Sequence, residues 1–235
     1  MSTNKDKTFA VIGCGRLGTA LSVFLTRKGY TASALASRSP SSAQKTRGFA
    51  GSGTVFDNPA DAVKEAALVF ITTPDTVIEP VCRELSGKQA FNRAHTVYHL
   101  SGALSSGILS SAKDCGASIG SIHPLQAFAP YEKGQASPFS GINISIEGDD
   151  TAVETGKSVV KALGANPFTI PTHAKTLYHA SAVVASNYLV TLEHFALRLL
   201  EQADLSEEEA FRILEPLIMG TLSNIKSKGS RAALT

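Results

Sequence analysis

The sequence predicts an α/β protein in which a doubly wound, mostly parallel sheet is followed by a smaller all-α domain. Two observations indicate the sheet. Short apolar segments alternate with helical patterns over the first two thirds of the chain, and a GxGxxG segment at residues 13–18 directly follows the first of them. The third observation is that no strand pattern follows Thr172. We therefore expect two domains, residues 1–171 and 172–235, with the boundary at Pro171.

The alternating pattern assigns the elements of the first domain. The predicted strands are Thr8–Ile12, Tyr30–Ala36, Leu68–Thr72, Thr96–Leu100, Ser118–Ile122, Gly141–Glu147 and Asn166–Ile170. The predicted helices are Arg16–Lys28, Pro40–Phe49, Pro59–Ala66, Thr76–Leu85, Ser105–Cys115 and Asp150–Leu163. Continuous apolar runs are typical of strands buried on both faces of a parallel sheet. The Pro-, Gly- and Ser-rich stretch Phe128–Ser140 predicts an exposed loop.

The second domain is predicted to consist of long helices. Thr172–Ala203 has the pattern of one helix of about 30 residues. Ser206 is the next N-cap candidate, and Glu209 follows it at the spacing of a capping box. The helix that starts there should run to about Ser227. Pro216 should kink it, unless the helix restarts at that residue.

Composition narrows the class of protein and its surroundings. The 235 residues carry a net charge of +2, with 43% hydrophobic and 18% charged residues, so neither nucleic acid nor an anionic membrane is expected as a partner. No apolar stretch is long enough to span a bilayer, and the first seven residues lack the features of a signal peptide. The three cysteines have no CxxC spacing. We therefore expect neither a disulfide framework nor a metal site, and a location in the reducing cytoplasm.

A glycine-rich turn has the spacing of a dinucleotide-binding loop. It reads Gly13-Cys14-Gly15-Arg16-Leu17-Gly18. Gly13 allows the tight turn, Gly15 lets a pyrophosphate approach the backbone, and Gly18 lets the helix pack against the strand. Backbone N–H groups and the helix dipole would then hold the phosphates. The alternative is a glycine-rich turn without a ligand. Cys14 has either a redox role or, as we favour, the role of a small residue in a tight space.

The residues after the second strand select the cofactor. NAD sites place an acidic residue there, on the ribose 2′-hydroxyl. This chain has Ser37-Arg38-Ser39 instead. Because an arginine fork between hydroxyls suits a 2′-phosphate, we expect NADP(H), with NAD as the second possibility. The alternative is that Arg38 is a solvated loop residue.

Several blocks together resemble a known family. They are IGCGRLGTAL, SRS, VFITTPD, HLSGAL, GSIHPLQAF and YHASAVVASNYLV. The chain resembles Rossmann-like proteins with a C-terminal domain of unknown function, which are regarded as NADP-dependent oxidoreductases of unassigned substrate. That family is similar to pyrroline-5-carboxylate reductases, to β-hydroxyacid dehydrogenases and, more distantly, to prephenate dehydrogenases. The resemblance implies a helical second domain, often dimeric, and an active site between domains. The family pattern would continue beyond Thr235, so further helices or a partner subunit are expected to complete the helical domain.

Candidate cofactor and substrate residues follow the ends of the predicted strands, where ligands bind in open α/β sheets. The resemblance places Thr72-Thr73-Pro74 beside the ribose and nicotinamide. The alternative is a turn in which Thr73 or Asp75 caps the next helix. Ser101 follows the next strand and precedes Gly102, which would leave room for a ligand. The alternative for Ser101 is a helix-capping role.

Two further residues are candidates for proton transfer. His123-Pro124 resembles the His-Pro motif of prephenate dehydrogenases, in which the histidine contacts the substrate, and a histidine suits proton transfer near neutral pH. In β-hydroxyacid dehydrogenases a lysine at the start of the corresponding helix moves the proton, which implicates Lys175. The asparagine expected four residues later is His179 here. A lysine shielded from water can have a lowered pKa and act as acid or base. The alternatives are a turn histidine and a surface lysine.

The long predicted helix is apolar on most sides, and this pattern predicts a partner. The residues are Val183, Val184, Tyr188, Leu189, Leu192, Phe195 and Leu199. A helix of this kind must be buried, so we expect a homodimer. The functional hypothesis is an NADP(H)-dependent oxidoreductase that acts on a small polar substrate. The alternative is a nucleotide-binding sensor or interaction protein that transfers no hydride.

Overall fold

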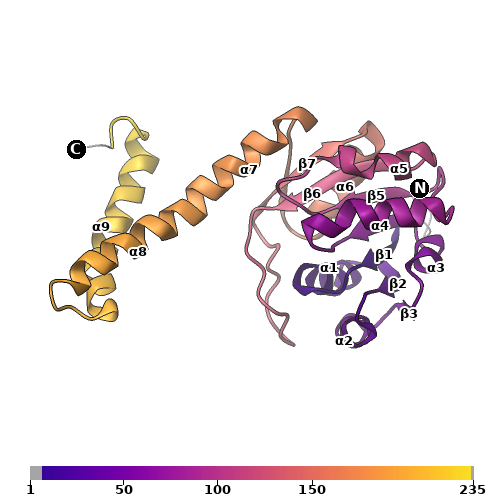
Figure 1. The fold of residues 1–235 in the computed structure, drawn as a ribbon, viewed down its shortest axis with the longest axis horizontal. Coiled ribbons are helices and arrows are strands. Elements are labelled where there is room, and N and C mark those ends of the chain that lie inside the picture. Colours follow the sequence, from indigo (N-terminus) through magenta and orange to yellow (C-terminus); the bar gives the residue numbers. More distant parts are fainter. Residues whose placement is uncertain (1–6, 234–235) are drawn as a thin grey trace. The chain divides into compact units, whose positions relative to one another are not determined.

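The computed structural model describes residues 7–233, and the fold class is the one the sequence predicts. An eight-stranded sheet has the order β3-β2-β1-β4-β5-β6-β7-β8 (Figure 1). The strands are β1 Thr8–Ile12, β2 Thr31–Ala36, β3 Thr54–Phe56, β4 Leu68–Ile71, β5 Thr96–His99, β6 Ser118–Pro124, β7 Asn143–Gly148 and β8 Asn166–Thr169. The first six are parallel, whereas β7 is antiparallel to β6 and parallel to β8. The carboxyl ends of β1 to β6 therefore share one edge.

Helices cover both faces of the sheet and bury an apolar core on each. Those of the first part are α1 Arg16–Arg27, α2 Pro40–Ala50, α3 Pro59–Lys64, α4 Asp75–Gly87, the 3-10 turn η2 Ser106–Leu109, α5 Ser110–Asp114 and α6 Asp150–Ala162. Helices α1, α2 and α6 contribute to the core on one face, and α3, α4 and α5 to the core on the other. This three-layer arrangement explains why the strands are apolar on both sides.

Most predicted elements are present within a residue or two, and three predictions need correction. Strand β3 was missed because it has only three residues, none of them fully buried. Strand β6 continues to Pro124, so His123 lies inside a strand and does not follow one. The segment Phe128–Ser140 is a loop but not an exposed one throughout, because Tyr131 and Phe139 are buried.

The rings of this loop attach it to α1 and α2. Tyr131 lies with its ring centroid 4.9 Å from that of Phe49, and Phe139 lies 6.2 Å from Phe24. The Arg27 guanidinium donates a hydrogen bond of 2.8 Å to the Tyr131 hydroxyl. The connection between β6 and β7 is therefore held beside the two helices that follow β1 and β2.

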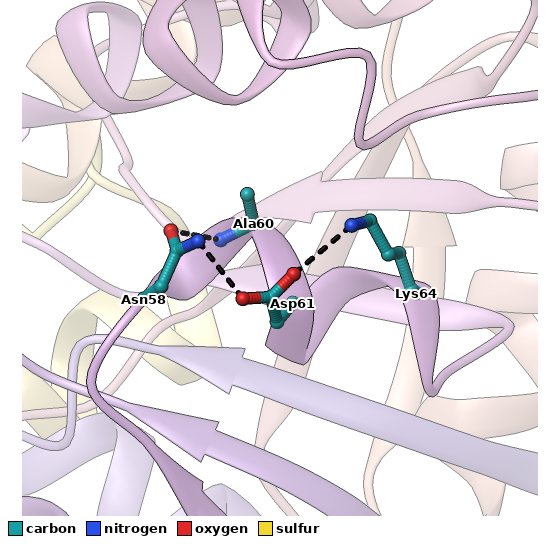
Figure 2. A network of polar contacts seen from close by, with 4 residues as sticks. All are labelled: Asn58, Ala60, Asp61 and Lys64. Atoms are coloured by element: carbon teal, nitrogen blue, oxygen red, sulfur yellow. Dashed lines mark hydrogen bonds and ion pairs between the residues drawn. The ribbon is translucent and has the colours of Figure 1, made fainter.

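Helix α3 begins with a side-chain cap that the structure shows in full (Figure 2). The Asn58 carbonyl oxygen accepts from the Ala60 N–H at 3.2 Å, and the Asn58 amide donates to Asp61 at 2.9 Å. Lys64 closes the turn with an ion pair of 2.9 Å to Asp61. Asn58→Ala should lower the free energy of unfolding by about 1 kcal/mol, because it removes the cap. Urea denaturation measures this change, and an unchanged midpoint would contradict it.

The chain forms two compact units, residues 1–179 and 180–235. Helix α7, Lys175–Val183, follows the 3-10 turn η3, Thr172–Ala174. A π-helical turn, η4 Val184–Tyr188, leads into α8, Leu189–Glu201, so the predicted long helix contains two irregular turns.

Within the second unit, α8 packs against α9, Glu207–Lys228. The predicted capping box between Ser206 and Glu209 is present. Pro216 lies inside α9, and the helix does not restart there. No helix among residues 7–233 is long and apolar enough to cross a membrane.

Candidate active site

The glycine loop lies at the carboxyl edge of β1 and is tightly packed at two of its three glycines. Gly13 has φ +109, and a Cβ there would lie 2.9 Å from the backbone of Thr72. A Cβ on Gly18 would lie 2.2 Å from the Gly13 carbonyl oxygen, which also accepts the Thr72 hydroxyl at 2.5 Å. A Cβ on Gly15 would have no atom within 4 Å. The middle glycine therefore faces open space, as approach of a ligand to the backbone requires.

The start of α1 offers donors and positive charge beside this open glycine. Gly15 is the N-cap residue of α1 and provides no side-chain cap. Arg16 and Leu17 form the first turn, with Arg16 exposed and Leu17 half-buried. A cavity of about 200 Å³ opens there, with Lys45 and Tyr131 also in its wall. A helix N-terminus next to two cationic side chains suits a phosphate group.

Cys14 lies between the glycines but is closed off. Its side chain is 6% exposed, and its thiol lies 3.7 Å from the Ala36 carbonyl oxygen. Burial raises the pKa of the Cys14 thiol to about 11. The thiol therefore stays protonated, which favours a packing role over a redox role.

The predicted 2′-phosphate residues follow β2 at the same edge. Ser37 is half-buried, whereas Arg38 and Ser39 are exposed. The Ser39 residue is the N-cap of α2 without a side-chain capping bond, and its hydroxyl is hydrogen-bonded to that of Ser41 at 2.8 Å. These side chains are accessible to a ligand at the ends of β1 and β2.

Thr72, Thr73 and Pro74 join β4 to α4. The Thr72 N–H donates to the Ile12 carbonyl oxygen at 2.9 Å, which fixes this turn against the end of β1. The N-cap of α4 is Pro74, without a side-chain hydrogen bond. Neither Thr73 nor Asp75 caps the helix, so the capping alternative for these two residues is wrong. The turn lies between β1 and β5, where a dinucleotide would cross the sheet edge.

Lys175 is the less exposed of the two proposed proton-transfer residues. Its side chain is 1% exposed, and its ammonium group donates to the Ser121 hydroxyl at 2.8 Å. Burial lowers the pKa of Lys175 to about 8, although the charges of Glu147 and Asp75 oppose that shift. The surface-lysine alternative is therefore wrong, and Lys175 can change its protonation state close to physiological pH.

His123 has a neutral imidazole at physiological pH. Burial, followed by the charges of Lys175 and His179, lowers the pKa of His123 to about 4. Its Nδ1 is 2.9 Å from the Tyr178 hydroxyl. The expected pKa near neutrality is thus wrong, because a neighbouring cation and burial both disfavour the imidazolium. His123 can orient a ligand by hydrogen bonding, but it is a poor proton donor at pH 7.

Ser101 organises the turn that follows β5. Its hydroxyl donates to Asp75 at 2.8 Å and accepts from the N–H groups of Ala103 and Leu104, both at 3.2 Å. It therefore caps the turn after β5 and not a helix starting near Ser105. Its bond to Asp75 ties the ends of β4 and β5 together.

The space beside Gly102 is filled by side chains. A Cβ on Gly102 would lie 2.6 Å from His123 Nε2 and 2.6 Å from His179 Nδ1. The two imidazoles therefore converge on this glycine, with ring centroids 6.1 Å apart. The glycine accommodates the histidines, and the room expected there for a ligand is taken by them.

A buried polar row that the sequence pattern did not predict lies beneath Lys175. His99, Ser121 and Glu147 are directly opposite one another in the register of β5, β6 and β7. None is more than 1% exposed. The signal was a charged residue within an otherwise apolar strand, which is unusual in a core.

The fold and the site define a class: an α/β protein with a GxGxxG loop at the end of β1 and a lysine-centred polar cluster. The chain belongs to the family of Rossmann-like domain proteins, whose model matches residues 4–124. The model of a domain of unknown function, DUF2520, matches residues 142–235. A search of curated proteins gave no match.

Solved structures of similar fold cover nearly the whole chain. The first is a "putative NADP oxidoreductase" from Bacteroides fragilis, with a TM-score of 0.76 and 20% identity over 99% of this chain and 85% of that one. A protein from Thermotoga maritima has a TM-score of 0.70 and 25% identity over 97% and 82%. A reductive aminase from Aspergillus terreus, in complex with NADPH and ethyl levulinate, has a TM-score of 0.72 and 14% identity over 93% and 74%.

Proposed function

We propose that this protein is an NADP(H)-dependent oxidoreductase that transfers a hydride between the nicotinamide and a small polar substrate. The observation that carries the proposal is the position of Lys175. This buried lysine has a pKa near 8 and lies against β6, at the same sheet edge as the glycine loop. A lysine with a lowered pKa in a buried polar cluster is typical of a residue that moves a proton.

The residues of the glycine loop fit the proposed cofactor. Gly13, Gly15 and Gly18, with Arg16 and Leu17, would hold the pyrophosphate at the uncapped start of α1. Ser37, Arg38 and Ser39 would bind the 2′-phosphate, and Thr72, Thr73 and Pro74 would contact the ribose and nicotinamide. The reductive aminase of similar fold, which contains NADPH, supports this assignment. NAD remains the second candidate cofactor.

The side chains beyond the cofactor would serve the substrate. A bound nicotinamide supplies or accepts the hydride. Lys175 would give a proton to the substrate atom that becomes the alcohol oxygen or the amine nitrogen of the product. The hydroxyl of Ser121 holds Lys175 Nζ in place. His123, as a neutral imidazole, would hydrogen-bond the substrate. Ser101 would align the turn between β5 and η2 through Asp75.

Calorimetry with NADPH tests the first half of the proposal. We expect saturable binding that is weaker for NADH, and absence of binding at millimolar cofactor would refute it. NADPH oxidation measured across imines, keto acids and keto sugars tests the second half. If NADPH binds but no substrate causes its oxidation, the alternative function, a nucleotide-binding sensor that transfers no hydride, would be favoured.

We further propose that residues 172–235 form a helical substrate and dimerisation domain, that residues 1–171 bind the dinucleotide, and that the protein is a cytoplasmic homodimer. The helices of the second unit expose large apolar side chains, with Leu192 65% and Phe195 64% exposed. Exposed apolar surface of this extent marks an interaction site. A second copy of the same helices would cover it.

Light scattering at micromolar concentration should give the mass of a dimer. The double variant Leu192→Glu/Phe195→Glu should dissociate it, because two carboxylates would be buried in an apolar interface. Gln44→Glu, an exposed change on α2, is the matched control and should leave the mass unchanged. A monomeric wild-type protein would refute the dimer.

A further inference from the structure

The buried row on β5, β6 and β7 contains a carboxylate whose charge needs a partner. Glu147 is 1% exposed, and it accepts hydrogen bonds from the N–H and the hydroxyl of Ser106, both at 2.7 Å. Two neutral donors do not compensate the loss of hydration of a buried carboxylate. Nearby positions on the same sheet face, such as Val97 and Ile119, are apolar. A cation close by would stabilise the charged form of this carboxyl group.

Lys175 is the cation that the geometry provides. Ser121 is directly opposite Glu147 in the antiparallel pair of β6 and β7, and its hydroxyl accepts from Lys175 Nζ at 2.8 Å. Side chains opposite each other in such a pair have Cβ atoms about 5 Å apart. The ammonium and the carboxylate are therefore neighbours of the same serine. Glu147 is the charge that most strongly raises the pKa of Lys175, ahead of the exposed Asp75.

The other groups around Lys175 do not replace this partner. His99 and His123 have pKa values of about 3 and 4, so they are neutral at physiological pH and cannot pair with an ammonium group as anions. His179 and Tyr178 lie on the same helix as Lys175, and the Tyr178 hydroxyl is 2.9 Å from His123. Among the described residues around Lys175, the carboxylates that act on its charge are Glu147 and Asp75.

We propose that Glu147 is the buried counter-ion of Lys175 and keeps its ammonium group charged and in place against Ser121. Glu147 is thus a positioning residue, which acts through Lys175 and has no contact with the substrate. The catalytic meaning of this pair rests on the proposed oxidoreductase function, but the pair itself does not. The competing interpretation is that Glu147 only holds the 3-10 turn η2 through Ser106.

Titration of Lys175 in the protein without ligand separates the two interpretations. Protein labelled with [ε-¹³C]lysine gives one resonance per lysine, and that of Lys175 is the one missing from the Lys175→Met variant. In Glu147→Gln we expect the midpoint of this resonance to fall by about one pH unit or more, a tenfold loss of proton affinity. Glu147→Asp keeps the charge and should retain most of the wild-type midpoint. Glu154→Gln, at an exposed site on α6, is the control and should change nothing.

An unchanged or raised midpoint in Glu147→Gln would overturn the proposal. If that variant fails to fold, the double variant Glu147→Gln/Lys175→Met decides. Recovery of folding supports the charge coupling of Glu147 and Lys175, because neither charge is then left buried alone. Failure of the double variant as well would assign Glu147 to the η2 turn and overturn the pair.

Once a substrate is known, the alkaline limb of the pH profile of the reduction rate should shift to lower pH in Glu147→Gln. Lack of any reductase activity would refute the proposed function and leave the titration result standing.

Discussion

Replacement of Lys175 by methionine should lower the rate of substrate reduction by about 10²- to 10⁴-fold, the usual contribution of a positioned acid. NADPH affinity should change little, because the glycine loop lies at the ends of β1 and β4 and Lys175 lies against β6. Methionine keeps the length and most of the volume of the buried chain. Steady-state NADPH oxidation, with calorimetry on the same sample, measures both quantities.

The pH dependence provides a second test of Lys175. In the reduction direction the protonated amine is the active form, so kcat/KM should be constant below pH 8 and fall as pH rises through about 8, the pKa of Lys175. In the oxidation direction the neutral amine is active, so the rate should rise through the same pH. Lys157→Met, at the surface of α6, is the control. A Lys175→Met enzyme with wild-type turnover would remove this residue from the mechanism.

Two alanine substitutions within the glycine loop should affect different properties, one the stability of the protein and the other its affinity for NADPH. Gly18→Ala should lower the free energy of unfolding by several kcal/mol, because its Cβ would lie 2.2 Å from the Gly13 carbonyl oxygen and cannot be accommodated without a backbone shift. Gly15→Ala should leave stability nearly unchanged, since no atom lies within 4 Å of its Cβ. It should nevertheless weaken NADPH binding tenfold or more, because the added methyl group occupies the path of the pyrophosphate.

Thermal unfolding and calorimetry on the two variants together test whether Gly18 serves packing and Gly15 serves the approach of the pyrophosphate. Gly48→Ala on α2, which also has no atom within 4 Å of its Cβ, is the matched control for Gly15→Ala. If Gly15→Ala binds NADPH like the wild type, the phosphates do not approach this glycine. The cofactor assignment would then need another site.

The glycine turn between β1 and α1 could be predicted from the sequence because its determinants are local. The glycine spacing, the preceding apolar strand and the following helix lie within about 20 residues. The same local logic predicted the capping box at Ser206 correctly.

The chemistry of the polar cluster depends on contacts between distant segments, which local patterns do not contain. Glu147 and Ser121 face each other only because β7 reverses direction and pairs antiparallel with β6. The pKa of His123 was mispredicted for the same reason, since it is lowered first by burial and then by the charge of Lys175, which lies on α7, 52 positions away in the sequence. Strand β3 was not predicted for a different reason. Its three residues, none of them fully buried, are too few to show the alternation of apolar and polar residues that indicates a strand.

The aromatic contacts that attach the loop between β6 and β7 restrict where its length can change in homologous chains. Tyr131 and Phe139 are buried against α1 and α2, so the stretches on either side of them have fixed lengths. Between these two rings, the segment from Glu132 to Ser137 is mostly exposed. Insertions and deletions in homologous chains should therefore concentrate at these six positions, whereas the spacing from His123 to Tyr131 should stay constant.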